Sequence, residues 1–180
     1  MKKAQIFFVV FVILIMTMSI IEFTLIKDDP LGNDYIEYKN FKFYPAQNNQ
    51  YIVTINNVQF IFNYLPNELN DISLPDFSLN NEKYYLLVNY SEKDNNLDYS
   101  LSKLGYTLNL INIKPVLACL NQENCKEDIP IKDCNTDSFY FKKSTINKVY
   151  LKDKCIVIEG DNLGISKSVD KINLKLAKIE

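Results

Sequence analysis

Residues 83–119 read "KYYLLVNYSEKDNNLDYSLSKLGYTLNLINIKPVLAC", and their hydrophobic pattern decides the fold class. The dense apolar run at 83–90 is typical of a buried strand. A polar stretch follows, in which Asn95 or Asn96 is expected to cap a helix. Apolar residues then recur at steps of four and three, as on one face of a helix: Leu97, Leu101, Leu104, Leu108 and Ile111. Because a second apolar run at 113–119 follows, the segment predicts two parallel strands joined by a helix.

Two hairpins are predicted before this unit. They are "YIEYKNFKFY" (35–44) and "QYIVTINNVQFIFNY" (50–64). Turns at Lys39-Asn40 and Asn56-Asn57 fit, since asparagine tolerates the positive φ of a tight hairpin turn. In the second hairpin this turn gathers apolar side chains on one face: Tyr51, Val53, Ile55, Val58, Phe60 and Phe62. The two hairpins together predict a four-stranded antiparallel meander.

The last third of the chain predicts short strands and a final helix. Strands are expected at 129–132, 138–143, 148–151 and 155–159. After Gly160, Asp161 or Asn162 is expected to cap an amphipathic helix with one apolar stripe: Ile165, Val169, Ile172, Leu176 and Ile179. The predicted fold class is therefore α+β: an N-terminal transmembrane helix, an antiparallel meander, one βαβ unit, short strands and a C-terminal amphipathic helix.

The N-terminal segment predicts a membrane anchor. Residues 6–26 are 21 residues, apolar except for Thr17, Ser19, Glu22 and Thr24, which is long enough to cross a bilayer as a helix. Lys2 and Lys3 precede it and favour a cytoplasmic N-terminus. We therefore expect a single-pass protein of the cell membrane with a signal anchor at 1–26, a linker at 27–34 and an exterior domain at 35–180.

Two other interpretations of this segment remain open. A cleaved signal peptide would have a shorter apolar region and a small-x-small cleavage site, and no Ala-x-Ala follows Ile13. Residues 3–5, "KAQ", resemble the cleavage site of archaeal type IV pilin precursors, although Val9 stands where many mature pilins have glutamate. A pilin-like filament subunit is thus an alternative.

Four cysteines lie in the predicted exterior domain: Cys119, Cys125, Cys134 and Cys155. Outside the cytoplasm such residues favour disulfides. Their spacing contains no CxxC, so neither a zinc site nor a thioredoxin-like redox site is favoured. Of the three possible pairings we expect Cys119–Cys125, which closes a small polar loop, and Cys134–Cys155, which joins two predicted strands.

Composition narrows the possible chemistry. The chain has no histidine, so Ser-His and Cys-His nucleophile pairs and histidine metal sites are excluded. It also has no arginine, which removes the bidentate clamp for phosphate. The net charge of −2 gives no reason to expect nucleic-acid binding. No residue is assigned a catalytic, cofactor-binding or metal-binding role, and no cofactor is expected.

A few weaker patterns remain. Asn89-Tyr90-Ser91 is an N-glycosylation sequon at a predicted strand end, so Asn89 is a possible glycosylation site. The polar residues 94–100 begin like an EF-hand loop, but Tyr99 and Gly105 stand where glycine and glutamate are needed, so the start of a helix explains them better. We attribute a row of lysines on the last helix to a solvated face. We attribute the many tyrosines to core packing.

Four segments, "YKNFKFY", "YIVTINNVQFIFNYLPNEL", "IPIKDC" and "KCIVIEGDNLGISKSVDKINLKLAKI", resemble a group of uncharacterised single-pass surface proteins of small-genome archaea. The resemblance implies an anchored α+β domain with paired cysteines and implies no activity. The expected function is an extracytoplasmic binding or structural surface domain. It would contact the bilayer through 6–26 and a protein or glycan partner outside. The alternative from another class is an envelope-polymer hydrolase or transferase using Asp, Glu and Lys.

Overall fold

The structure is a computed structural model, and it describes residues 34–122, 125–126 and 128–179. The predicted anchor at 6–26, and all but the last residue of the linker at 27–34, lie outside these ranges. Within them, no helix has the length and hydrophobicity needed to cross a membrane. The chain divides into two compact units after Tyr35, and the second unit, residues 36–180, is described here by itself.

The first sheet is the predicted antiparallel meander. Its strands lie in chain order: β1 (Ile36–Tyr38), β2 (Phe41–Ala46), β3 (Gln50–Ile55) and β4 (Val58–Phe62). Both predicted registers are confirmed, since Tyr38 pairs with Phe41 and Ile55 pairs with Val58. All four turn residues have φ between 47° and 69°, the left-handed backbone that a two-residue hairpin turn needs. A 3-10 turn, η1 (Gln47–Asn49), joins the two hairpins.

The second sheet is mixed and has the strand order β6-β5-β7-β9-β8. Its strands are β5 (Lys83–Val88), β6 (Lys114–Cys119), β7 (Ser138–Lys143), β8 (Lys148–Lys152) and β9 (Cys155–Gly160). All neighbouring pairs are parallel except β8 and β9. The structure is thus α+β, with one antiparallel sheet, one mixed sheet and a C-terminal helix.

One predicted strand is absent. Residues 129–132 form no strand, and Ile131 makes only an isolated bridge to Cys119. Two hydrogen bonds hold the segment there: the Cys119 N–H donates to the Pro130 carbonyl, and the Lys132 N–H donates to the Cys119 carbonyl. Pro130 has no N–H of its own, so a longer ladder is not favoured.

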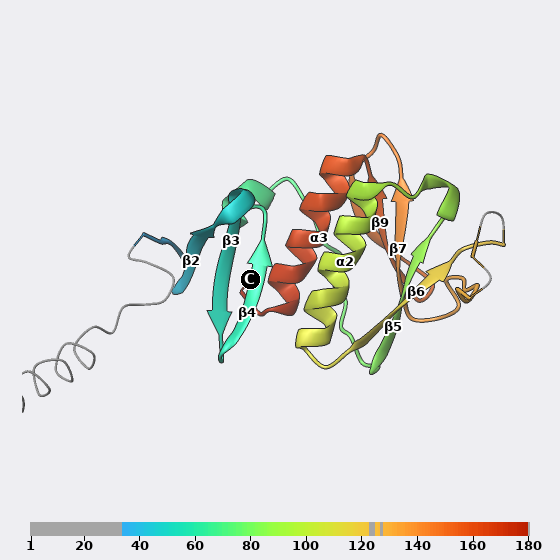
Figure 1. The fold of residues 1–180 in the computed structure, drawn as a ribbon, viewed down its shortest axis with the longest axis horizontal. Helices are drawn as coiled ribbons and strands as arrows, with labels where there is room; N and C mark the ends of the chain where they lie inside the picture. Colours follow the sequence, from blue (N-terminus) through green and yellow to red (C-terminus); the bar gives the residue numbers. More distant parts are fainter. Residues whose placement is uncertain (1–33, 123–124, 127, 180) are drawn as a thin grey trace, which may run out of the picture. The chain divides into compact units, whose positions relative to one another are not determined.

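Two helices cover one face of the mixed sheet (Figure 1). They are α2 (Asn95–Leu110), which joins β5 to β6 as predicted, and α3 (Asn162–Leu176). Their apolar stripes pack with Phe139, Phe141 and Ile158 in one hydrophobic core. Asp161 caps α3 as predicted, but α2 is capped by Asp94 and not by Asn95 or Asn96. The Asp94 carboxylate accepts the Leu97 N–H at 2.8 Å.

The meander packs on the other side of the helices, so the unit has three layers (Figure 1). The last turn of α3 and the residues after it supply Leu174, Ala177 and Ile179 to a second core that contains Phe43 and Phe62 of the meander. The connection between the sheets includes η2 (Pro66–Leu69), and η3 (Tyr90–Glu92) precedes α2. The opposite face of the mixed sheet carries no described helix.

Candidate functional site

A groove lies on this helix-free face of the mixed sheet. Side chains alternate across a sheet, and pairing places Val157 of β9 between Tyr140 of β7 and Tyr150 of β8. The two tyrosines therefore stand two strand spacings apart, about 10 Å between their backbones. Val157 is fully buried, and both tyrosines pack in the same apolar cluster with it.

The crossover segment between β6 and β7 supplies one wall of this groove. The groove encloses about 380 Å3, within the usual range of small-ligand sites. We call it the tyrosine groove. Its lining consists of Leu120, Asp133, Cys134, Asn135, Tyr140, Lys142, Tyr150, Lys152, Asp153 and Val157. The Cys134–Cys155 disulfide ties the crossover segment to the start of β9, so this wall is covalently fixed to the sheet.

Glu159 lies one row further along the same face. It pairs with Lys142 and Lys148 in the neighbouring strands, whose ammonium groups lie 3.1 Å and 3.4 Å from its two carboxylate oxygens. The Tyr150 hydroxyl also donates to it, at 3.0 Å. Burial of the carboxylate opposes its ionisation, but the hydrogen bonds from Lys142, Tyr150 and Ser144 outweigh burial and lower the pKa of Glu159 to about 2.

Glu159 is consequently ionised at any physiological pH and already occupied on both oxygens. A general acid or base needs a pKa close to the working pH, so Glu159 is poorly suited to proton transfer. Its effect is to hold Lys142 and the ring of Tyr150 in place at the edge of the tyrosine groove.

The two tyrosines are held as neutral phenols. Burial raises the pKa of Tyr140, and the charge of Glu92 adds to this. Burial and the hydrogen bond to Glu159 raise the pKa of Tyr150. Lys148 also sits over the Tyr150 ring, 4.8 Å from its centre, a cation–π contact. Both rings thus offer fixed apolar surfaces to the groove.

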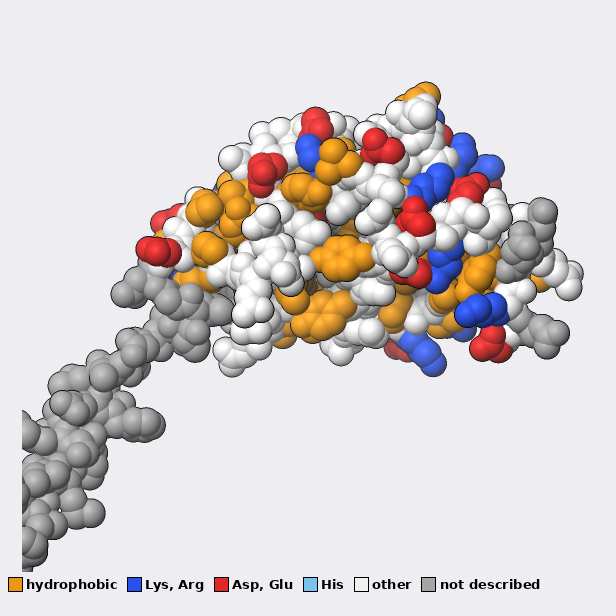
Figure 2. Space-filling model, turned by 45° about the horizontal axis from the view of Figure 1, so that its top comes forward, with side chains coloured by type: hydrophobic (Ala, Val, Ile, Leu, Met, Phe, Trp, Pro, Cys, Tyr) orange, Lys and Arg blue, Asp and Glu red, His pale blue; other side chains and the backbone are white. Residues whose placement is uncertain are grey.

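Charges of both signs line the tyrosine groove in equal number. The lining contains Lys142 and Lys152 together with Asp133 and Asp153. The Asp133 carboxylate accepts the backbone N–H of Asn135 at 3.0 Å and its side-chain amide at 2.8 Å, and these bonds lower its pKa. Figure 2 shows the same mixture more widely, with lysine and acidic side chains interspersed on the right half of the view.

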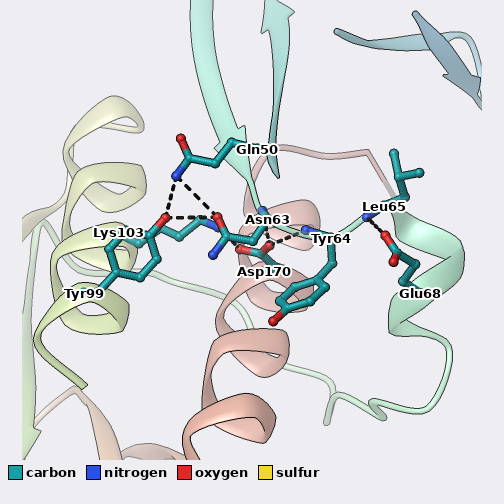
Figure 3. A network of polar contacts seen from close by, with 8 residues as sticks. All are labelled: Gln50, Asn63, Tyr64, Leu65, Glu68, Tyr99, Lys103 and Asp170. Carbon is teal, nitrogen blue, oxygen red and sulfur yellow. Dashed lines mark hydrogen bonds and ion pairs between the residues drawn. The ribbon is translucent and has the colours of Figure 1, made fainter. Parts of the chain in front are cut away.

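A second polar cluster lies between the two helices and the meander (Figure 3). Asp170 of α3 is fully buried, forms an ion pair with Lys103 of α2, and accepts the backbone N–H groups of Asn63 and Tyr64 at 2.6 Å and 3.0 Å. Burial raises the pKa of Asp170 and lowers the pKa of Lys103. This cluster joins both helices to the end of β4, and we assign it a structural role.

The remaining polar residues of this cluster are also engaged. The Tyr99 hydroxyl donates to Asn63 at 2.9 Å, and the Gln50 side-chain amide donates to the Tyr99 oxygen at 2.7 Å (Figure 3). At the meander's end, the Leu65 N–H donates to Glu68. The two bonds made by the Tyr99 hydroxyl join the meander to α2.

The sequence-predicted site residues have different outcomes. The structure joins Cys119 to Cys125 and Cys134 to Cys155, the pairs that sequence spacing favours. Asn89 lies at the end of β5, where its amide donates to Glu92 and accepts from the Ser91 hydroxyl, each at 2.9 Å. Its glycosylation stays a prediction.

The EF-hand pattern is accounted for by the helix start. Asp94 caps α2, while Asp98 pairs with Lys93. Across the described ranges, no group of three or more histidine, cysteine, aspartate or glutamate side chains could hold a metal ion.

Sequence reasoning missed the tyrosine groove. In "SFYFKK" the polar residues Ser138 and Lys142 alternate with Phe139 and Phe141, and "CIVIEG" carries Glu159 among apolar residues. Such polar positions signal a face that is not fully covered. The order of the strands, which brings Tyr140 and Tyr150 to either side of Val157, is not visible in that pattern.

No known protein family, curated protein or solved structure matches the chain.

Proposed function

We propose that the chain is a membrane-anchored extracytoplasmic binding domain that holds its ligand in the tyrosine groove. One observation carries the proposal: two partly exposed aromatic side chains, Tyr140 and Tyr150, line a groove of ligand size. Binding sites typically combine such apolar walls with a few oriented polar groups. Lys142, Lys152 and Asn135 are the polar groups here.

The placement outside the membrane rests on two features. Residues 6–26 are apolar and follow Lys2 and Lys3, as in a signal anchor with a cytoplasmic N-terminus. All four cysteines are paired in disulfides, which persist in oxidising compartments.

The envelope-polymer enzyme is the weaker candidate. It needs a carboxyl group that can exchange a proton near the working pH. Two carboxyl groups at the tyrosine groove are engaged, because Glu159 binds two lysines and a tyrosine, and Asp133 binds Asn135. Asp153 also lines the groove, but one carboxyl group does not supply the pair that glycoside hydrolysis uses. The pilin alternative depends on residues 5–26, which lie outside the described ranges.

The binding proposal is tested with the full-length chain in the envelopes of cells that produce it. A photo-crosslinking amino acid replaces Asn135, an exposed residue of the groove wall, or Thr54, an exposed residue of the meander. We expect a discrete adduct from position 135 only, and its loss when Tyr150→Ala is added. Equal adducts from both positions would contradict the proposal.

The placement has a separate test. Cells are lysed in denaturant with a thiol-alkylating reagent, and the full-length chain is analysed by mass. We expect no alkylated cysteine before reduction and four afterwards. Four alkylated cysteines without reduction would place the domain in a reducing compartment and refute the extracytoplasmic assignment.

A further inference from the structure

The charge balance of the tyrosine groove restricts what can bind there. Lys142 and Lys152 are opposed by Asp133 and Asp153. A polyanion placed in the groove would meet two carboxylates, and a polycation would meet two ammonium groups, so each would suffer repulsion from half of the lining charges. An uncharged ligand avoids this repulsion.

The hydrogen-bonding groups indicate a hydroxyl-rich ligand. Lys142 and Lys152 only donate, Asp153 only accepts, and the Asn135 amide does both. A ligand that satisfies such a mixture must carry groups that donate and accept at closely spaced positions. Hydroxyl groups do both, and a sugar ring carries several of them around its edge.

The aromatic side chains suit the apolar C–H face of a sugar ring. Tyr140 and Tyr150 both pair with Val157, which sets their backbones about 10 Å apart. Val157 itself is fully buried, so a ligand in the groove meets the partly exposed tyrosine side chains. A sugar ring that lies across the groove places its C–H face against them.

We propose that the tyrosine groove binds an uncharged carbohydrate. A sugar ring lies against Tyr140 and Tyr150, and its hydroxyl groups bond to Lys142 and Asn135. This inference rests on the proposed function, because it names the ligand class of the same groove.

The test uses the full-length chain in lipid nanodiscs and calorimetric titration with hexasaccharides. The uncharged probes are maltohexaose, mannohexaose and chitohexaose, while oligogalacturonate and the glucosamine hexamer are the charged counterparts. We expect at least one uncharged probe to bind roughly tenfold or more tightly than either charged one. Its affinity should change less than twofold between low and high salt, because ionic strength screens only charge interactions.

Variants then locate the binding. Tyr140→Ala and Tyr150→Ala should each weaken binding by roughly tenfold, the loss of one aromatic contact. Tyr150→Phe keeps the ring and should bind within threefold of wild type. Tyr106→Ala removes an exposed tyrosine of α2 outside the groove and serves as the matched control, with affinity unchanged.

Each other outcome overturns the inference in a recognisable way. Binding only of oligogalacturonate, sensitive to salt and lost in Tyr150→Ala, would refute an uncharged ligand but keep the groove as the binding site. Uncharged binding that survives both alanine variants would place the carbohydrate elsewhere. Failure of every probe to bind at millimolar concentration would refute carbohydrate binding. The proposed function is tested separately, by the crosslinked adduct at position 135.

Discussion

Replacing Glu159 by glutamine should remove a stabilising interaction that depends on pH. In the folded protein the pKa of Glu159 is about 2, against an ordinary value of 4.5. A difference of this size corresponds to about 3 kcal/mol of folding free energy when Glu159 is ionised. The side chains of Lys142 and Lys148 are 43% and 48% exposed, so solvent screening reduces the expected contribution to about 2 kcal/mol.

The direction with pH follows from the lowered pKa. A carboxyl group whose pKa is lower in the folded than in the unfolded state stabilises the fold above its unfolded pKa. That stability is lost as the pH falls toward the folded pKa. The window is therefore pH 4.5 to about 2. The free energy of unfolding of the wild type should exceed that of Glu159→Gln by about 2 kcal/mol at pH 7. At about pH 3 the difference should be less than half as large.

The assay is urea unfolding of residues 34–180, a segment that contains both hydrophobic cores, followed by circular dichroism at several pH values. Glu82→Gln removes an exposed carboxyl group directly before β5. This variant controls for the loss of one negative charge as such. A difference between wild type and Glu159→Gln that stays constant from pH 7 to about 3 would refute the reasoning, since the lowered pKa requires it to shrink.

Further substitutions test individual interactions that stabilise the fold. Lys103→Met leaves the buried carboxylate of Asp170 without its cation and should lower the free energy of unfolding by about 3–5 kcal/mol. The double variant with Asp170→Asn should lose less, and additive losses in urea titrations would contradict the pairing. Replacing Cys134 and Cys155 together by alanine should lower the free energy of unfolding by about 3 kcal/mol, and an unchanged melting temperature would contradict this. Gly164→Ala places a methyl group against the Asn147 side-chain oxygen, which accepts the Asp161 N–H. This substitution should lower the free energy of unfolding by about 1 kcal/mol. A melting temperature equal to that of the wild type would contradict this.

Local chemistry made part of the fold predictable. The hairpin registers followed from asparagine and lysine at positions that need positive φ, together with alternation on the flanking strands. The two helices could be predicted from their apolar periodicity. Asp161 was one of two candidates for the cap of α3, because it lies just before the last apolar stripe. These features depend on residues a few positions apart, which a sequence displays directly.

Features set by distant residues were not predictable in the same way. Asp94 caps α2 while its other carboxylate oxygen binds Lys143, 49 residues further along the chain, so Asn95 and Asn96 were equally plausible from local sequence. The ion pair between Lys103 and Asp170 joins helices 67 residues apart. In each case the deciding partner comes from another element of the fold.

The tyrosine groove follows from how the mixed sheet is covered. Both α2 and α3 pack on one face, and the described residues among 120–137, which connect β6 to β7, contain no helix. A helix in this crossover would have buried the second face, as in most parallel sheets. Instead the segment is fastened at Cys134 to the start of β9 and leaves Tyr140 and Tyr150 partly open beside it. The disulfide therefore shapes the tyrosine groove as well as stabilising the fold, because it fixes the groove wall to the sheet.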